Sequence, residues 1–272
     1  MLKKHSHSLD YYTYISGMRN WNSFYKVLFS FSSLLWVIIA DSSLISLWTI
    51  LFMSVLILKV GKIGFHDYVG VLKIPIVFII MSSIAIMTTV DPNLENAWYI
   101  DGKCLGFQFF SYYVYLTKAQ CMLSCKVAAK AIGAICAMYM MTLSTPMGEV
   151  LAVFRKLHAP KIIVELMHLI YRYIFMMSDV YQMQKDATTS RLGYINFRTS
   201  VRSFSNNVAN LLVMSLARAN TCYDAMESRG YDGEFCVMEE RRKIGAGQIG
   251  IMLIYFVVTI GLTVFVSFRK TI

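Results

Sequence analysis

Two short polar stretches share the pattern Asp-Ala-x-x-Ser-Arg, and their residue types and spacing are suited to recognition chemistry. The first runs from Asp186 to Arg191 and the second from Asp224 to Arg229. In each copy the alanine and the arginine are four residues apart, so a helix would place them on the same face. A guanidinium beside a small side chain can enter a groove and donate paired hydrogen bonds to carboxylates or carbonyls.

Each copy is expected to close a long helix, because glycine follows the arginine directly as Gly230 and after one residue as Gly193. A cation in the last turn with a glycine beyond it is also ordinary helix-capping chemistry. Capping does not explain why aspartate, alanine and serine recur at matched positions. Two like arginine tips would suit a partner with two like grooves, such as a symmetric dimer. The residues predicted to dock are Ala187, Ser190, Arg191, Ala225, Ser228, Arg229 and Gly230.

The elements that must position these residues are apolar. Of 272 residues, 57% are hydrophobic and 15% are charged, whereas a soluble domain carries about 25% charged residues. This deficit, a mean hydropathy of +0.53 and several long apolar runs indicate an integral protein of the lipid bilayer. The 26 Lys and Arg outnumber the 16 Asp and Glu, which is typical of cytoplasmic loops. Since no dense basic run or basic–aromatic stripe occurs, we expect no nucleic-acid partner.

The fold class expected is an all-α membrane protein with about five transmembrane helices and long cytoplasmic helices. Segment 161–186 is a possible sixth span, but Glu165, Arg172 and Asp179 recur every seven residues along it. This stripe favours an amphipathic helix, and a sixth span with a bundle-facing stripe is the alternative. Pro75 is expected in the first turn of the third span, where proline is tolerated. The five predicted spans are 24–40, 44–60, 74–90, 127–145 and 249–268.

The distribution of Lys and Arg predicts a cytoplasmic N-terminus and an external loop after Asp91. Residues 146–247 then lie inside and hold 13 of the 26 Lys and Arg. Five crossings leave Arg269 and Lys270 outside, against the rule, and a sixth crossing would remove that conflict. The predicted regions are 1–145 with four spans, a cytoplasmic region 146–247, and a final span in 248–272. The cytoplasmic helices are expected at 146–157, 161–191 and 199–229.

No set of residues predicts catalysis or a resident metal. Nucleotide-binding glycine loops and the common hydrolase motifs are missing from the sequence. His5 and His7 form a His-Ser-His near the N-terminus, which we expect to be idle. Glu165 and His168 could share a metal, but Arg172 is the favoured partner for Glu165.

The stretch "ANTCYDAMESRGYDGEF" resembles the signature of the T components of energy-coupling factor transporters, in particular the cobalt-type, CbiQ-like subgroup. The stretches "TLSTPMGEVLAVFRKLHAP" and "LIYRYIFMMSDVYQMQKDA" are similar to the central region of that family. The resemblance covers roughly residues 120–236. The first motif departs from the family pattern, because Leu192 stands where the family usually has glycine.

This resemblance implies a non-catalytic coupling subunit in the cell membrane of a bacterium or archaeon. The two arginine tips would sit in grooves of two ABC-type ATPase subunits, which would bind ATP and Mg²⁺, while this chain would bind no cofactor. A separate substrate-binding membrane subunit would carry Co²⁺ or Ni²⁺. A self-contained secondary transporter or another helical membrane scaffold is the alternative function, although the spans hold almost no ionisable residues of the kind that such a transporter needs.

Overall fold

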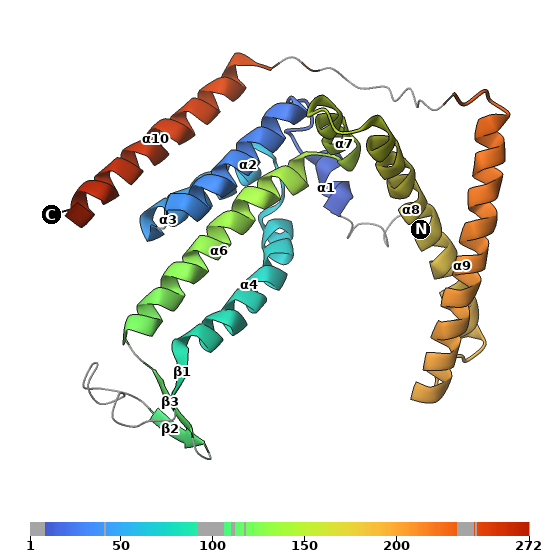
Figure 1. Cartoon of the computed structure of the whole chain (residues 1–272), viewed down its shortest axis with the longest axis horizontal. Helices are drawn as coiled ribbons and strands as arrows, with labels where there is room; N and C mark the ends of the chain where they lie inside the picture. Colours follow the sequence, from blue (N-terminus) through green and yellow to red (C-terminus); the bar gives the residue numbers. More distant parts are fainter. Residues whose placement is uncertain are drawn as a thin grey trace. The chain divides into compact units, whose positions relative to one another are not determined.

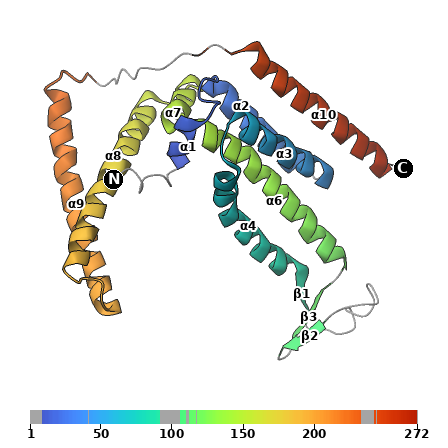
Figure 2. The same cartoon turned by 180° about the vertical axis from the view of Figure 1, so that it is seen from behind.

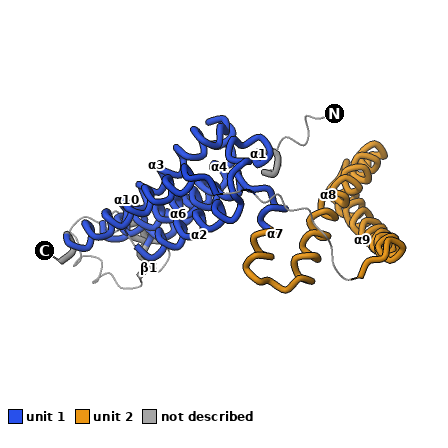
Figure 3. Tube along the Cα trace, turned by 90° about the horizontal axis from the view of Figure 1, so that it is seen from above, with its two compact units in different colours: residues 1–150, 241–272 blue, residues 151–240 orange. Residues whose placement is uncertain are grey.

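The computed structural model describes residues 9–40, 42–91, 106–109, 112–116, 118–232, 242 and 244–271. The chain divides into two compact units, drawn in blue and orange in Figure 3. The first, Met1–Val150 with Arg241–Ile272, is called the membrane unit here. The second, Leu151–Glu240, is called the hairpin unit.

Most of the membrane unit is helical, and α6 is its central helix, with α2, α3 and α4 packed along it (Figure 1). The helix α3 continues into one π-helical turn at Leu56–Val60. The α-helices of this unit are α1 (Leu9–Ile15), α2 (Ser23–Ala40), α3 (Ser43–Val55), α4 (Phe65–Met87), α6 (Lys118–Ser144) and α10 (Ala246–Thr271).

Five helices of the described chain are long and apolar enough to cross a membrane, which confirms the predicted helical membrane fold. They are α2, α3 with its π-helical turn, α4, α6 and α10. The alternative sixth span, which falls in α8, is not among them. Its recurring charges are the physical reason, because each charged side chain in a span costs several kcal/mol, about 3 at mid-bilayer.

The third span starts earlier than the sequence predicted, at Phe65 instead of position 74, because the helix continues through the polar residues before Ile74. Pro75 therefore lies inside α4 instead of in its first turn, and that prediction is wrong. Proline cannot donate to the carbonyl four residues before it, which here belongs to Val71. The Tyr139 hydroxyl of α6 donates to this carbonyl at 3.3 Å, so the freed acceptor is satisfied within the bundle.

A small antiparallel sheet joins α4 to α6 and was not predicted. Its strands are β1 (Thr88–Asp91), β2 (Gly106–Phe109) and β3 (Tyr112–Leu116), in the order β1-β3-β2. The register pairs Thr88 with Leu116 and Gly106 with Tyr115. Threonine, valine and tyrosine favour strands, but runs of four or five residues are too short to stand out from an apolar sequence.

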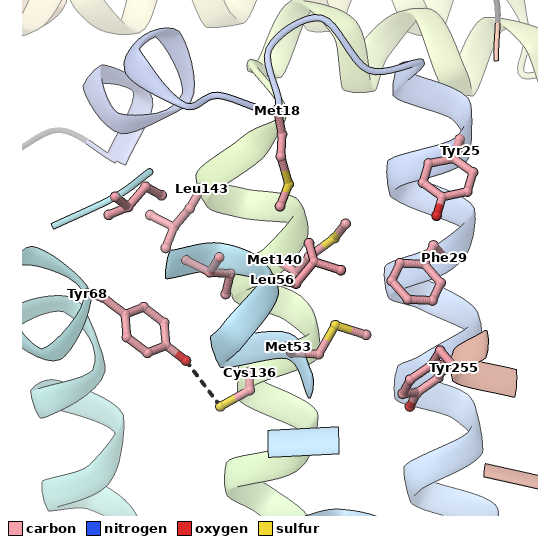
Figure 4. Close-up of a cluster of buried hydrophobic side chains, with 12 residues drawn as sticks. Met18, Tyr25, Phe29, Met53, Leu56, Tyr68, Cys136, Met140, Leu143 and Tyr255 are labelled. Atoms are coloured by element: carbon pink, nitrogen blue, oxygen red, sulfur yellow. Dashed lines mark hydrogen bonds between the residues drawn. The ribbon is translucent and has the colours of Figure 1, made fainter. Parts of the chain in front are cut away.

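The core of the membrane unit has methionines between two aromatic parts: Figure 4 shows Tyr25, Phe29 and Tyr255 on one side of Met53 and Met140, and Tyr68 on the other. The ring of Tyr255 in α10 lies 5.3 Å from that of Phe29 in α2 and 5.1 Å from that of Phe52 in α3. Gly133 lets α6 approach α3 closely, because a Cβ there would lie 3.3 Å from the Ser46 carbonyl oxygen. Close packing at small residues is a main source of helix association in lipid.

Polar contacts between side chains also connect the spans. The Thr49 hydroxyl of α3 lies 3.1 Å from the Tyr255 hydroxyl of α10. The Tyr68 hydroxyl of α4 lies 3.0 Å from that of Ser54 and donates to the Cys136 sulfur of α6 at 3.5 Å, drawn as a dashed line in Figure 4. Such pairs typically contribute about 0.6 kcal/mol each in a bilayer.

The hairpin unit consists mainly of α8 (Lys161–Ser190) and α9 (Phe197–Glu227), which pack antiparallel (Figure 2). The shorter α7 (Met147–Lys156) precedes them. His158 takes a left-handed conformation with φ of 62° and separates α7 from α8. The three helices that the sequence placed in this region are present, with ends shifted by up to two residues.

Candidate functional site

The first arginine tip, at the end of α8, ends with two nested backbone hydrogen bonds. The Gly193 N–H donates to the Thr188 carbonyl at 2.9 Å, and the Leu192 N–H donates to the Thr189 carbonyl at 3.0 Å. This pair of bonds defines a Schellman motif, which satisfies carbonyls that a helix end otherwise leaves without donors.

The second arginine tip, at the end of α9, has the same pair of bonds. The Tyr231 N–H donates to the Met226 carbonyl at 3.1 Å, and the Gly230 N–H donates to the Glu227 carbonyl at 2.9 Å. The two copies of the hexapeptide therefore occupy matched positions in matched helix ends. This shared backbone geometry accounts for the left-handed residue after each arginine, and it does not explain the recurring aspartate, alanine and serine.

The residue after each arginine has a left-handed backbone. Gly230 has φ of 72°, and Leu192 has φ of 62°. Glycine adopts this region without steric cost, whereas leucine pays for the contact between its Cβ and the backbone. Leu192 therefore adopts the same left-handed backbone conformation that Gly230 has in the second copy.

The serine of each copy is bonded within its own helix. The Ser190 hydroxyl donates to the Asp186 carbonyl at 3.0 Å, and the Ser228 hydroxyl donates to the Ala225 carbonyl at 3.0 Å. Both hydroxyl protons are thus used inside the chain. In docking, these serines could therefore shape the tip and accept hydrogen bonds from a partner, but their hydroxyl protons are not available to donate.

All seven residues predicted to dock are solvent-exposed. Within the part of the chain that the structure describes, the guanidinium groups of Arg191 and Arg229 form no hydrogen bond or ion pair. Arginine side chains of this kind have all five N–H donors free for a planar anionic or carbonyl acceptor.

The antiparallel hairpin separates the two arginines widely. Arg191 lies at the turn between α8 and α9, and Arg229 lies at the opposite, open end (Figure 1). Since α8 has 30 residues, the two tips are about 45 Å apart along the hairpin at 1.5 Å per residue. A single groove could therefore not receive both tips at once.

A second constellation, which sequence reasoning missed, surrounds the fully buried Lys26 in the first turn of α2. Its ammonium donates to the Ser144 carbonyl at the end of α6 at 2.8 Å, and to the Glu149 carboxylate of α7 at 3.3 Å. Glu149 also accepts from the Ser23 hydroxyl at 2.7 Å and lies 3.6 Å from Arg242. We call Ser23, Lys26, Glu149 and Arg242 the Lys26 cluster.

The Lys26 cluster holds four chain segments at one end of the membrane unit. They are the start of α2, the end of α6, the start of α7 and the residues before α10. The Asn22 amide also donates to the Arg242 carbonyl at 2.5 Å, and the Tyr25 hydroxyl donates to the Gln248 carbonyl at 2.6 Å. A lysine near the start of an apolar helix was the available signal, because a buried charge needs a partner.

The predicted pairing of Glu165 with Arg172 is wrong. The Glu165 carboxylate accepts a hydrogen bond from the Tyr231 hydroxyl at 3.1 Å, whereas Arg172 forms no ion pair with the described residues. Seven residues along a helix separate their Cα atoms by about 10 Å, so both side chains would have to extend toward each other, whereas the Tyr231 hydroxyl lies within direct reach of the carboxylate. His5 and His7 lie outside the described residues.

Comparisons with known proteins agree in pointing to one family. The family model described as CbiQ, cobalt transport protein, matches residues 16–241. An uncharacterized protein of Methanocaldococcus jannaschii is 27% identical over 233 residues, which cover 85% of this chain and 83% of that protein.

Two further relatives have names that refer to cobalt. A putative fused cobalt transport protein, CbiMQ, of Methanocorpusculum labreanum is 26% identical over 86% of this chain and 38% of its own length. The cobalt transport protein CbiQ of Salmonella typhimurium is 21% identical over 60% of this chain and 70% of its own length.

Proposed function

This chain belongs to the CbiQ family of cobalt transport proteins, and on this premise we propose that it is the coupling subunit of an energy-coupling factor importer. The chain is a multi-pass membrane component of cobalt transport. In the proposed role it transmits motion from two ABC-type ATPase subunits to a separate substrate-binding membrane subunit that carries Co²⁺ or Ni²⁺.

The observation that carries the proposal is the matched geometry of the two arginine tips. Both tips have the same hexapeptide, the same backbone hydrogen bonds and exposed guanidinium groups without partners in the described chain. A partner that offers the same groove twice, as a pair of like ATPase subunits does, would accept both. Each guanidinium would donate to carboxylates or carbonyls in its groove.

Motion would reach the membrane through α7. This helix begins in the membrane unit and continues into the hairpin unit. The Lys26 cluster ties its first turn to α2 and α6 through Glu149. In the proposed mechanism, closure of the ATPase pair on ATP moves the hairpin, and α7 passes the displacement to the spans. The chain itself supplies no catalytic group, and ATP and Mg²⁺ belong to the partners.

The match to the fused relative supports a separate substrate-binding partner. This chain covers 38% of that fused cobalt transport protein. The larger remainder of the relative has no counterpart in the matched region. We infer that a component like the rest of that fused relative works together with this chain.

The test is co-purification and cobalt uptake with the chain expressed beside its ATPase pair and its substrate-binding subunit. The double substitution Arg191→Ala/Arg229→Ala should abolish ATPase retention and uptake, because a contact in a desolvated groove typically contributes about 2 kcal/mol or more per arginine. Arg202→Ala, which removes another exposed arginine of α9, serves as the matched control and should change neither measurement. Wild-type retention and uptake in the double variant would refute the docking role.

A further inference from the structure

A cationic groove lies beside the second arginine tip. It has a volume of about 670 Å³ and runs between the first half of α8 and the last turns of α9, both within the hairpin unit. Three guanidinium groups line it together with an apolar floor. These lining residues are Arg172, Arg218 and Arg229, and Leu169, Met176 and Met226.

The charge of the groove is not balanced within the described chain. Three arginines face the carboxylate of Asp232, which lines the groove, and that of Glu165, which accepts from the lining Tyr231, so the formal charge is +1 (three minus two). None of the three guanidinium groups forms an ion pair or a side-chain hydrogen bond with another described residue. Three like charges with fewer carboxylates beside them repel one another, so an anionic occupant would gain from all three.

The walls of the groove are held in place by the chain that follows the second tip. Tyr231 lines the groove, and its hydroxyl donates to the Glu165 carboxylate of α8 at 3.1 Å. This contact joins the end of α9 to the beginning of α8. The groove and Arg229 are therefore parts of one fixed arrangement, and a partner that receives Arg229 comes within side-chain reach of Arg172 and Arg218.

Beside the first arginine tip the side chains are bonded to one another, and the cations near it in the sequence, Lys185, Arg198 and Arg202, are exposed. The side chains packed there are neutral and satisfy one another: the Thr188 hydroxyl donates to the Asn207 carbonyl oxygen at 3.1 Å, and the Asn207 amide donates to the Tyr194 hydroxyl at 3.1 Å. The Ser203 hydroxyl donates to the Gly193 carbonyl at 2.9 Å. The two tips thus match in backbone but not in their neighbours.

We propose that this groove receives an acidic side-chain segment of the ATPase subunit that binds Arg229, so that the two arginine tips make unequal contacts. The proposal rests on the proposed function. Aspartate or glutamate fits the groove, because guanidinium groups bind carboxylates in planar, paired geometry and the apolar floor accommodates their methylene groups. Docking is then reciprocal at the second tip: its arginine enters the ATPase, and an ATPase carboxylate enters the groove.

The test removes the two groove arginines that are not part of the tip. The variant Arg172→Gln/Arg218→Gln should bind the ATPase pair roughly tenfold more weakly, with a flatter dependence of affinity on KCl concentration. The full chain in detergent is titrated with the purified ATPase pair at several KCl concentrations. The variant Lys185→Gln/Arg202→Gln removes the same charge from exposed positions of α8 and α9 nearer the turn and should bind like the wild type.

The outcomes separate the two proposals. If the groove variant binds like the wild type while Arg229→Ala loses affinity, the groove proposal is wrong and the coupling role stands. If Arg191→Ala/Arg229→Ala keeps full affinity, the coupling role itself fails. Unequal contacts also predict a larger loss for Arg229→Ala than for Arg191→Ala, and equal losses would contradict them.

A lipid phosphate could also bind three guanidinium groups. Vesicles of phosphatidylglycerol, incubated with the groove variant and with the wild type, distinguish this occupant from a protein carboxylate. We expect equal vesicle binding for both. A loss of vesicle binding with unchanged ATPase affinity would assign the groove to an anionic lipid and overturn the proposal.

Discussion

At the scale of single residues, the position after each arginine decides how the helix ends. Leu192 and Gly230 share the left-handed backbone, but only glycine reaches it without strain. A Cβ at Gly230 would meet no atom within 4 Å, so steric contact with the surroundings does not restrict that position. At this position the two copies therefore differ in backbone strain.

We expect Leu192→Gly to stabilise the end of α8 by about 0.5 to 1 kcal/mol, because relief of the left-handed strain exceeds the extra entropy of glycine in the unfolded chain. Hydrogen exchange of the Leu192 and Gly193 amides measures this as slower local opening. ATPase retention should stay at the wild-type level, since the arginine and the backbone geometry are unchanged.

Gly230→Ala is the matched control and should act in the opposite direction. Alanine at φ of 72° introduces about 1 kcal/mol of strain at the end of α9. Exchange of the Tyr231 amide, which donates to Met226, should become faster. Equal exchange rates in both variants and the wild type would mean that the left-handed residue does not limit either helix end.

At the scale of elements, the Lys26 cluster keeps α2, α6 and α7 together. The ammonium is fully buried, whereas the Glu149 side chain is 23% exposed. A buried ion pair is weak evidence of net stabilisation, but removal of one partner leaves an uncompensated charge. The chief effect of the cluster is therefore on specificity: one arrangement of the three helices has a much lower free energy than arrangements that separate Lys26 from Glu149.

Glu149→Gln should destabilise the membrane unit by about 3 kcal/mol, because the buried Lys26 side chain would lose its carboxylate partner. The double substitution Lys26→Met/Glu149→Gln should recover a large part of this loss, since no buried charge remains. Thermal unfolding in detergent gives both values. Additive losses in the double variant would show that the two side chains are not coupled.

At the scale of the whole molecule, the length of the hairpin sets the distance between the two tips. The antiparallel packing of α8 and α9 places one arginine at the turn and the other at the open end. If each tip docks on its own ATPase subunit, this distance must match the spacing of the two grooves. A rigid hairpin would then also transmit force between them.

Deletion of residues 178–184 and 211–217 tests this length requirement. Each deletion removes seven residues, close to two helical turns, so the facing sides are preserved while the tips approach by about 10 Å. We expect uptake to be lost and ATPase retention to fall to the level of a single-tip variant such as Arg191→Ala. If uptake stayed intact in this deletion variant, simultaneous docking of both tips would not be required.

The sequence alone determined the features that depend on neighbours within a few residues. Five apolar runs, the recurring charges of α8, and two arginine tips followed by glycines could all be recognised, because helix bonds and caps join residues up to five positions apart. The start of α4 could not be recognised, because the polar residues after Phe65 resemble a loop. In addition, Pro75 leaves the Val71 carbonyl without its helical donor, and only the folded structure shows that the Tyr139 hydroxyl donates to it instead.

Only the tertiary structure decided which distant groups meet. Lys26 and Glu149 are 123 positions apart and come together because α2 and α6 pack side by side. Arg172 and Arg218 belong to different helices and share a groove because α8 and α9 run antiparallel. These contacts follow from packing and burial, which sum over the whole fold and leave no local pattern in the order of residues.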